Sequence, residues 1–539
     1  MSENPTQSQV PRALQRWELP LLLLVIAVGA AIRIWHLPRV PGLYYDEALD
    51  AIESLRIARG LGFPIFFDSN NHMREPLFMW IGAVFVWFGG ASAVAFRATA
   101  VFIGIATIPA VWLLAREWSG ARVAIIAAAT LALMRWHIHF SALGFRTIMA
   151  PLCMTMVAWH FLRMARRRSP ADAAWCGFWL GAGMYTYLAF RLMPLAMAIP
   201  AGLALWRCDM PRATLAKLYA IAAAAALLVF LPLGIDYARN PHHFAGRSDE
   251  VNFLNKPGGA ALLLAQARDV ALMPLVRGDH VGKHNLPGPP EFIQWNPMPG
   301  EEVAARWRDA EDAARAAGTP PPDPHGTGVP ALPLAMGLVF YAGILATIRK
   351  AKGSIATLLL LSWLLVGSLA SILSFGAPNM LRLVILTPVV ALFCARAIEA
   401  MASSFPNEKR AMVLCATLLA AFGVIEFRRL AAWPKHPMVR QEFNVEMREI
   451  GDFLRAQPDR LTARLPFGAP PTLVYLADRY EFAEGEAKLP GRSWELQTLP
   501  PFPPLPNPST PLKGGRSFEV LHPIGISMGR LVEVENQNE

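Results

Sequence analysis

Two neighbouring stretches decide the fold: the apolar run Leu19–Ala31 (LPLLLLVIAVGAA) and the acidic segment Tyr44-Tyr45-Asp46-Glu47 that follows it. Adjacent carboxylates are costly beside lipid unless they face water or a partner. Many further apolar runs come after this pair. We therefore expect the carboxylates at the mouth of a multi-span bundle, which suggests chemistry at a membrane surface.

The composition is that of a membrane protein. The 539 residues are 54% hydrophobic and 17% charged, whereas soluble domains carry about 25% charged residues. Since a spanning helix needs about 20 apolar residues, the sequence predicts an all-α polytopic membrane protein of about eleven transmembrane helices. These helices are expected near residues 18–36, 93–115, 121–138, 147–163, 172–189, 191–206, 214–233, 330–348, 354–375, 381–400 and 410–426.

The basic residues predict the topology. The net charge of +10 lies mainly in short connectors between apolar runs, which indicates membrane topology and not nucleic-acid binding. The apolar segment between Pro76 and Gly89 is only about 13 residues long, so we expect a juxtamembrane helix there. The basic clusters then share the cytoplasmic side with an uncleaved N-terminal signal anchor. These clusters lie at 163–168, 207–217, 349–352 and 409–410.

The same parity places most of the non-membrane chain outside. It predicts a membrane domain at 1–426, with external loops at 37–92 and 234–329, and an extracytoplasmic segment at 427–539. The expected location is the bacterial inner membrane. The pattern further predicts helices at 46–60, 301–317 and 439–456, a strand at 473–477, Pro-rich loops at 319–322 and 500–511, and a small α/β C-terminal appendage.

Five cysteines lie in or beside apolar runs, and none forms a Cys-x-x-Cys pair, so neither a disulfide framework nor a zinc site is expected. His137 and His139 are two residues apart, whereas helix-borne metal ligands are usually spaced by three or four. Hydrogen bonding at the interface is the favoured role for these histidines. We therefore expect no bound metal ion, and the sequence indicates no cofactor.

Polar residues on the predicted outer side are the candidate site. Isolated arginines there need a reason, because positive charge is normally depleted on that side. One reason is a phosphate, which the guanidinium fork binds well; the alternative is snorkelling to lipid headgroups. For Asp46 the alternative is a helix cap. The candidate phosphate- or substrate-binding residues are Arg74, Glu75, His139, Arg146, Tyr187, Arg191 and Arg382.

Several stretches together resemble the GT-C glycosyltransferases, in particular the protein O-mannosyltransferase and lipid A aminoarabinose transferase branch. They are the acidic pair, a Pro-Leu step opening the juxtamembrane helix, and Phe96-Arg97-Ala98 at the start of a span. Residues 136–146 and 183–191 also resemble recurrent segments of bacterial members. The resemblance covers about the first 235 residues well.

The resemblance implies a GT-C-like bundle and an inverting enzyme that takes a sugar from a polyprenyl-phosphate donor. Asp46 would be the general base, and Glu47 would orient the acceptor or the base. Displacement at an anomeric carbon needs a base on one face and cations for the departing phosphate on the other. The acceptor, whether protein, lipid or glycan, stays open.

Other functions remain open at this stage. A transporter or flippase of lipid-linked glycans should show ionisable residues near the bilayer midplane, whereas polar groups here gather at the outer ends of the spans. An O-antigen ligase or polymerase would use a large late external loop, which 234–329 supplies. A membrane scaffold with an external domain is the third alternative.

The topology can be tested with fusion reporters. Alkaline phosphatase, which needs an oxidising compartment, should be active when fused after residue 539 and inactive when inserted in the 163–168 connector, because that connector is predicted to be cytoplasmic. Green fluorescent protein should give the opposite pattern. Phosphatase activity at both positions would contradict the predicted sidedness.

Overall fold

The computed structural model describes residues 14–69, 72–207, 210–252, 254, 259–287, 328–350, 354–374, 376–457, 462–465, 471–477, 481–484, 492–498, 517–521 and 527–535. The helix expected at 301–317, the two Pro-rich runs and Cys208 lie outside these residues. The four cysteines within them are free.

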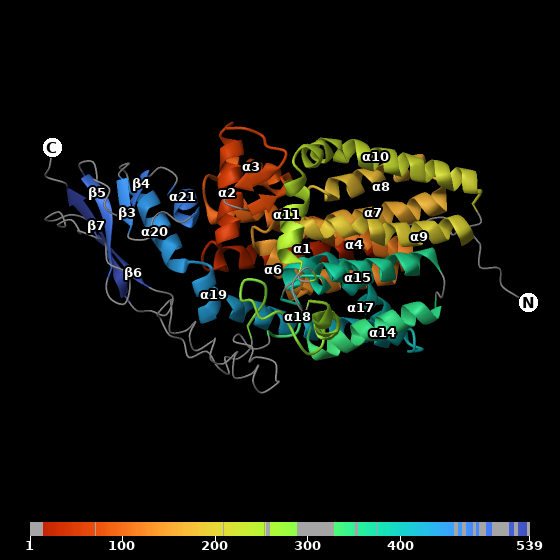
Figure 1. Ribbon diagram of the computed structural model, residues 1–539. Helices are drawn as coiled ribbons and strands as arrows, with labels where there is room; N and C mark the ends of the chain where they lie inside the picture. Colours follow the sequence, from red (N-terminus) through yellow and green to blue (C-terminus); the bar gives the residue numbers. More distant parts are fainter. Residues whose placement is uncertain are drawn as a thin grey trace, which may run out of the picture.

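A bundle of long apolar helices forms the larger part of the molecule (Figure 1). Its helices are α1 (Glu18–His36), α4 (Ala93–Ser119), α5 (Ala121–Leu133), α7 (Met149–Arg167), α8 (Pro170–Gly183), α9 (Met193–Arg207), α10 (Arg212–Arg239), α14 (Leu334–Lys350), α15 (Ile355–Ile372), α17 (Thr387–Ala402) and α18 (Glu408–Ala432). The chain is thus a multi-pass membrane protein.

When helices are counted by length and composition, fewer of them qualify as membrane spans than the eleven expected. In the described part of the chain, eight helical segments are long and apolar enough to cross a membrane, or nine if α5 and α6 (Arg135–Ala142), bent by 56°, count as one span. The two others of the expected eleven are α8 and α14, which have 14 and 17 residues. All eleven expected positions are thus occupied by helices, and α8 and α14 are the two that belong to none of these segments.

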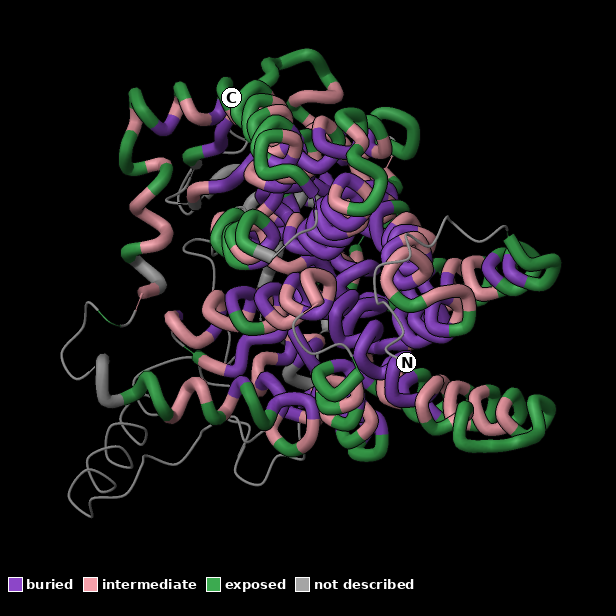
Figure 2. The backbone as a smooth tube through the Cα atoms, turned by 90° about the vertical axis from the view of Figure 1, so that its right-hand side faces the viewer, coloured by how far each residue is buried: buried purple, intermediate pink, exposed green. Residues whose placement is uncertain are grey.

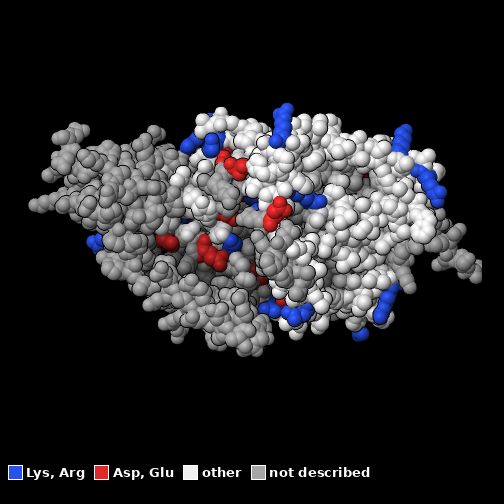
Figure 3. Space-filling model, viewed as in Figure 1, with Lys and Arg blue, Asp and Glu red and all other residues white. Residues whose placement is uncertain are grey.

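Ion pairs show which helix ends lie together. Glu18 at the start of α1 accepts from Arg116 near the end of α4 at 2.7 Å, and Arg122 in the first turn of α5 pairs with Glu408 at the start of α18. The start of α1 therefore lies near the end of α4, and the start of α5 lies near the start of α18. In Figure 3 most of the bundle surface is uncharged, and several basic side chains lie at its right-hand end.

Short elements cover the other end of the bundle (Figure 1). They are η1 (Leu37–Arg39), α2 (Tyr45–Ala58), β1 (Phe67–Ser69), β2 (His72–Arg74), α3 (Leu77–Gly89), α6, η2 (Arg146–Ile148), η3 (Leu188–Leu192), α11 (Pro241–Val251), α12 (Gly259–Leu272), α16 (Met380–Leu383), η5 (Val384–Leu386), η6 (Trp433–Lys435) and α19 (Pro437–Glu442). The expected helix at 46–60 is α2, and β1 pairs antiparallel with β2.

Helix α3 is the short apolar segment that charge parity excluded from the spans. It has 13 residues, packs against α2 and α4, and leaves Trp87 and Phe88 exposed. Gly90, with φ of 69°, ends it because this left-handed conformation is strained for other residues. An exposed aromatic end on a short apolar helix suits the boundary between membrane and water.

The core lies along the bundle axis. Viewed end-on in Figure 2, buried segments gather in the middle and exposed ones at the rim. Among the described spans, the segment Met380–Ala402, which contains α17, is the most enclosed, with 89% of its apolar part buried, whereas the spans that contain α10 and α18 have 11%. The exposed apolar faces of α10 and α18 therefore belong against lipid.

The C-terminal part is a small α/β unit. Its helices are α20 (Val445–Ala456) and α21 (Pro471–Leu476), and its strands are β3 (Thr462–Leu465), β4 (Glu481–Glu484), β5 (Arg492–Thr498), β6 (Ser517–Leu521) and β7 (Ser527–Glu535). The strand order is β4-β3-β5-β7-β6. Strand β3 runs parallel to β4 and β5, whereas β7 is antiparallel to β5 and β6.

Two expectations for this unit were wrong in detail. The strand expected at 473–477 is mostly the short helix α21, whose buried Leu473 and Leu476 pack beside α20. A short apolar run does not distinguish a strand from a buried helical turn. The helix expected at 439–456 is interrupted between α19 and α20, where Asn444 has φ of 47°.

The C-terminal unit contacts the loop before α2. The Leu43 amide donates to Phe443 O at 2.8 Å, and Thr472 Oγ1 donates to Leu43 O at 3.0 Å. Tyr475 Oη reaches Ser92 O, the N-cap residue of α4, at 3.1 Å. The appendage thus fixes the chain just ahead of Asp46.

Glu446 in α20 makes this unit sensitive to pH. Burial is the main reason that its pKa is raised to about 7; a hydrogen bond to its own backbone and the charge of Arg440 lower the pKa, whereas the charge of Glu449 raises it. The folded state therefore holds a proton that the unfolded chain releases near pH 4.5. The stabilisation is complete below about pH 4.5 and is lost as the pH rises through about 7.

We expect Glu446→Gln to reduce this dependence, because the amide cannot ionise. The wild-type melting temperature in detergent should fall between about pH 5 and pH 8, reflecting up to about 3 kcal/mol, and the variant should lose most of that fall. Asp452→Asn, at an exposed carboxylate of the same helix, is the control. An unchanged fall in Glu446→Gln would contradict the assignment.

Candidate active site

Glu47 is the fully buried centre of the acidic segment. Its carboxylate accepts from Arg97 Nε at 2.6 Å and Arg97 Nη2 at 2.7 Å, and from the Gly144 amide at 2.6 Å. It also accepts from the amide of Tyr44, the N-cap residue of α2, at 3.3 Å. One side chain therefore joins the start of α2 to α4 and to the turn after α6.

The turn after α6 admits only glycine at this contact. A Cβ atom at Gly144 would lie 2.3 Å from the Phe96 ring and 2.8 Å from Glu47 Cγ, which is closer than real contacts allow. The Gly144 amide can approach the carboxylate because this space is empty. Arg146, two residues later, is thereby positioned relative to α2.

Asp46 has a different environment from Glu47. The capping contacts of α2 are made by Tyr44 and Glu47, and Asp46 lies one position after the first helical residue. It is half-buried and lines a small cavity with a volume of about 30 Å³. The other lining residues are Leu49, Met73, Arg74, Arg146 and Arg247.

Two of these arginines are paired with buried carboxylates that are not part of the cavity lining. Arg74 Nη1 donates to Asp50 Oδ1 at 2.8 Å, while Arg146 lies 3.5 Å from both Asp50 Oδ2 and Glu75 Oε2. Burial raises the pKa of Asp50, although both guanidinium groups act in the opposite direction. The guanidinium orientations are thus set before any ligand binds.

Arg191 braces this network and is not part of the cavity lining. Its Nη2 donates to Glu75 Oε1 and to Tyr237 Oη, each at 2.9 Å, and its Cζ lies 4.7 Å from the centroid of the Phe244 ring. Tyr187, from the same connection, places its ring 5.7 Å from Arg146 Cζ. Arg191 therefore contacts Glu75, which positions Arg146, and Tyr187 lies beside Arg146 itself.

His139 is buried and contacts the backbone of the long loop after α12. Its Nε2 lies 2.9 Å from Lys283 O. The Lys283 ammonium hydrogen-bonds to Tyr44 Oη and lies 3.9 Å from the centroid of the Tyr44 ring. His139 thus helps to place the Lys283 ammonium group beside Tyr44, the first residue of the acidic segment.

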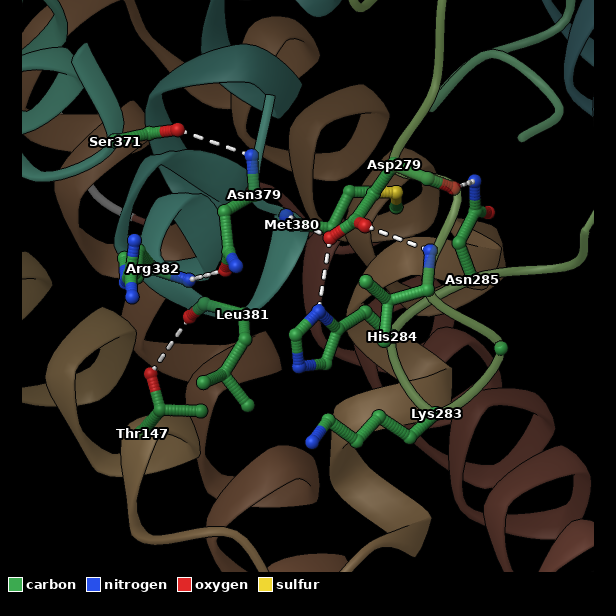
Figure 4. A network of polar contacts seen from close by, with 12 residues as sticks. Thr147, Asp279, Lys283, His284, Asn285, Ser371, Asn379, Met380, Leu381 and Arg382 are labelled. Atoms are coloured by element: carbon green, nitrogen blue, oxygen red, sulfur yellow. Dashed lines mark hydrogen bonds and ion pairs between the residues drawn. The ribbon is translucent and has the colours of Figure 1, made fainter. Parts of the chain in front are cut away.

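Arg382 belongs to a separate network (Figure 4). It hydrogen-bonds to Ser374 Oγ, and its amide donates to Asn379 Oδ1 at 3.0 Å. Nearby, buried Asp279 accepts from His284 Nδ1 at 2.9 Å and from the Met380 amide at 2.7 Å. This network attaches the long loop to α16, and Arg382 does not line the Asp46 cavity.

Four residues of the site were missed from the sequence, and only two had a local signal. Asp50 follows Asp46 by four residues, a spacing that puts both on one helix face. Arg97 lies within a stretch that drew attention for its resemblance alone. Arg247 and Lys283 come from the loop 234–329 and had no signal, because only the tertiary fold brings them to α2.

The cavity has a simple electrostatic character. Three guanidinium groups and one carboxylate line it, and the buried carboxylates of Asp50 and Glu75 pair with two of these guanidinium groups, Arg74 and Arg146. Such a lining attracts an anionic group, and guanidinium favours phosphate. The carboxylate can at the same time accept a proton from a hydroxyl group within hydrogen-bond reach.

A family model of known proteins matches part of the chain. Residues 73–235 match the family model of dolichyl-phosphate-mannose-protein mannosyltransferase. No curated protein matches the sequence.

The fold is similar to solved structures at low identity. ArnT from Cupriavidus metallidurans bound to undecaprenyl phosphate aligns at 12% identity and a TM-score of 0.54, over 95% of this chain and 97% of that one. The apo oligosaccharyltransferase of Archaeoglobus fulgidus aligns at 14% identity and a TM-score of 0.51, over 88% of this chain. This chain spans 65% of that archaeal protein.

The Glu47–Arg97 pair should be essential for stability. Breaking a buried ion pair leaves an uncompensated charge, so Glu47→Gln is expected to cost about 3–5 kcal/mol and to lower the melting temperature in detergent. Glu117→Gln, at an outlying pair with Arg166, is the control and should cost about 0–1 kcal/mol. Equal melting of the two variants would show that Glu47 does not hold these elements together.

Proposed function

We propose that this chain, a PMT/ArnT-like member of the GT-C glycosyltransferase superfamily, transfers a sugar from a polyprenyl-phosphate donor to an acceptor with inversion. The observation that carries the proposal is the cavity in which Asp46 faces the guanidinium groups of Arg74, Arg146 and Arg247. The chemistry requires a base and an anion site within one small space, and this cavity has both.

The reaction follows from these groups. The acceptor hydroxyl gives its proton to Asp46, and its oxygen attacks the anomeric carbon of the sugar. The bond between that carbon and the phosphate oxygen breaks, and its electron pair leaves with the polyprenyl phosphate. The guanidinium groups stabilise the charge on the departing phosphate. One displacement by the acceptor itself gives inversion, without a second carboxylate acting as nucleophile.

Support for the donor comes from two structural neighbours. The ArnT structure is bound to undecaprenyl phosphate, and a second structure of the archaeal enzyme, AglB, is in complex with an inhibitory peptide and a dolichol-phosphate. A lipid with a single phosphate suits a lining of three arginines. The acceptor class is left open by this argument.

The remaining residues act by holding the cavity-lining side chains in position. Asp50 and Glu75 orient Arg146, and Arg191 and Tyr187 support that arrangement. Glu47 positions Asp46 by fixing the start of α2, so we regard it as a positioning residue. We assign Arg382 no contact with the reacting phosphate, since it lies in the separate α16 network.

We further propose the bacterial inner membrane as the location, with the N-terminus in the cytoplasm and the C-terminus outside. Support comes from the basic connectors, which lie at the end of the bundle away from α2 and α3 (Figure 1). The division into a membrane domain, 1–426, and a C-terminal segment, 427–539, fits this arrangement, although α18 continues to Ala432.

The base assignment is tested with Asp46→Asn. Loss of a general base should reduce transfer from a radiolabelled polyprenyl-phosphate sugar by about 10²–10⁴-fold, while donor binding remains, because the arginines are intact. Arg146→Gln, in contrast, should reduce both transfer and donor binding, because it removes one of the guanidinium groups. Asp452→Asn in the appendage is the matched control.

Equal transfer by wild type and Asp46→Asn would remove Asp46 as the base. Measurable movement of the lipid-linked sugar across the membrane, without transfer to any acceptor, would favour a flippase and overturn the proposed reaction.

A further inference from the structure

A second cluster of ligating side chains lies outside the cavity. Asp68 is the middle residue of β1, and His242 and His243 lie in the first turn of α11. His242 Nε2 is 3.2 Å and His243 Nε2 is 3.6 Å from Asp68 Oδ2. Ligand atoms of the three residues lie within 4.8 Å of one another.

The spacing matches a tetrahedral metal. With metal–ligand bonds of about 2.0–2.1 Å, the ligand atoms of tetrahedral Zn²⁺ lie about 3.3–3.4 Å apart, close to the two separations from Asp68. Two imidazoles and a carboxylate are a donor set that zinc accepts. The side chains of Asp68 and His242 are 40% and 58% exposed, so an ion can enter from solvent and keep a water as fourth ligand.

The surroundings of His243 provide an independent indication. Its Nδ1 lies 2.7 Å from Asp236 Oδ2, and Asn240 Nδ2 donates to the other Asp236 oxygen at 3.2 Å. The ring also stacks on Phe66 with centroids 4.4 Å apart. Metal-binding histidines usually donate the second ring nitrogen to a carboxylate, which fixes the tautomer and directs the free nitrogen to the metal.

We propose that Asp68, His242 and His243 bind a divalent transition metal, with Zn²⁺ as the best-fitting ion. The metal joins two segments that are far apart in sequence: the hairpin β1–β2, which ends at Arg74, and α11, which carries Arg247. Both arginines line the Asp46 cavity. The metal thus acts as a clamp across the cavity wall, and its binding does not depend on sugar transfer.

Without a metal, these residues are a largely exposed ion pair. Such pairs contribute little to stability, so hydrogen bonding and metal binding predict different results. The test measures metal bound to the purified full-length chain in detergent, produced without a polyhistidine tag, after zinc loading and removal of loose metal. Elemental analysis should find about one zinc per chain.

Substitutions identify the ligands. His243→Ala and Asp68→Asn should each reduce retained zinc to about a tenth, and Asp236→Asn should weaken affinity about 10–100-fold as expected for an outer-shell partner. His436→Ala and Asp452→Asn, in the C-terminal region, are the controls and should retain full zinc. Co²⁺ in place of zinc should give the intense visible absorption of a tetrahedral site, and His243→Ala should abolish it.

Zinc should also raise the melting temperature of the wild type and of Asp46→Asn, but not that of His243→Ala. This comparison separates the metal site from the reaction, since Asp46→Asn tests only the latter. Absence of retained zinc in folded wild type, or equal zinc in wild type and His243→Ala, would overturn the proposal.

Discussion

The bidentate contact between Glu47 and Arg97 is the interaction on which the rest of the site depends. Both side chains are buried, and the carboxylate also accepts from the Gly144 amide. Removing either charge would leave the other without compensation in an apolar interior. The contact therefore fixes three things at once: the direction of α2, the position of α4 and the turn that leads to Arg146.

Once α2 is fixed, two adjacent carboxylates have different roles. Glu47 is buried, and both of its carboxylate oxygens accept hydrogen bonds from the protein, whereas Asp46 lines a cavity together with three arginines. Behind that wall, Asp50 and Glu75 hold the guanidinium groups in place. This preorganisation matters because donors that are already oriented need not rearrange when charge develops on a leaving group.

Local patterns predicted much of the architecture, and non-local contacts explain what they missed. Apolar length and basic connectors indicated a polytopic bundle, with a short apolar segment that became α3. They could not show where α8 and α14 end, or that 471–476 is helical, since packing against neighbours decides such short segments. His139 illustrates the same limit, because its contact with Lys283 joins residues 144 positions apart.

The sequence by itself determined the membrane class, the end of the bundle where polar groups gather, and Asp46 as the residue of interest. The first two features depend on composition and periodicity, which are local properties, whereas the choice of Asp46 came from its placement after the first apolar run and from the resemblance to GT-C enzymes. Only the tertiary structure decided that Asp46 and Glu47 face different surroundings, and that Arg247 joins Arg74 and Arg146 around one cavity. The physical reason is that electrostatic environment depends on distance and burial in space, and the chain brings these groups together only through its fold.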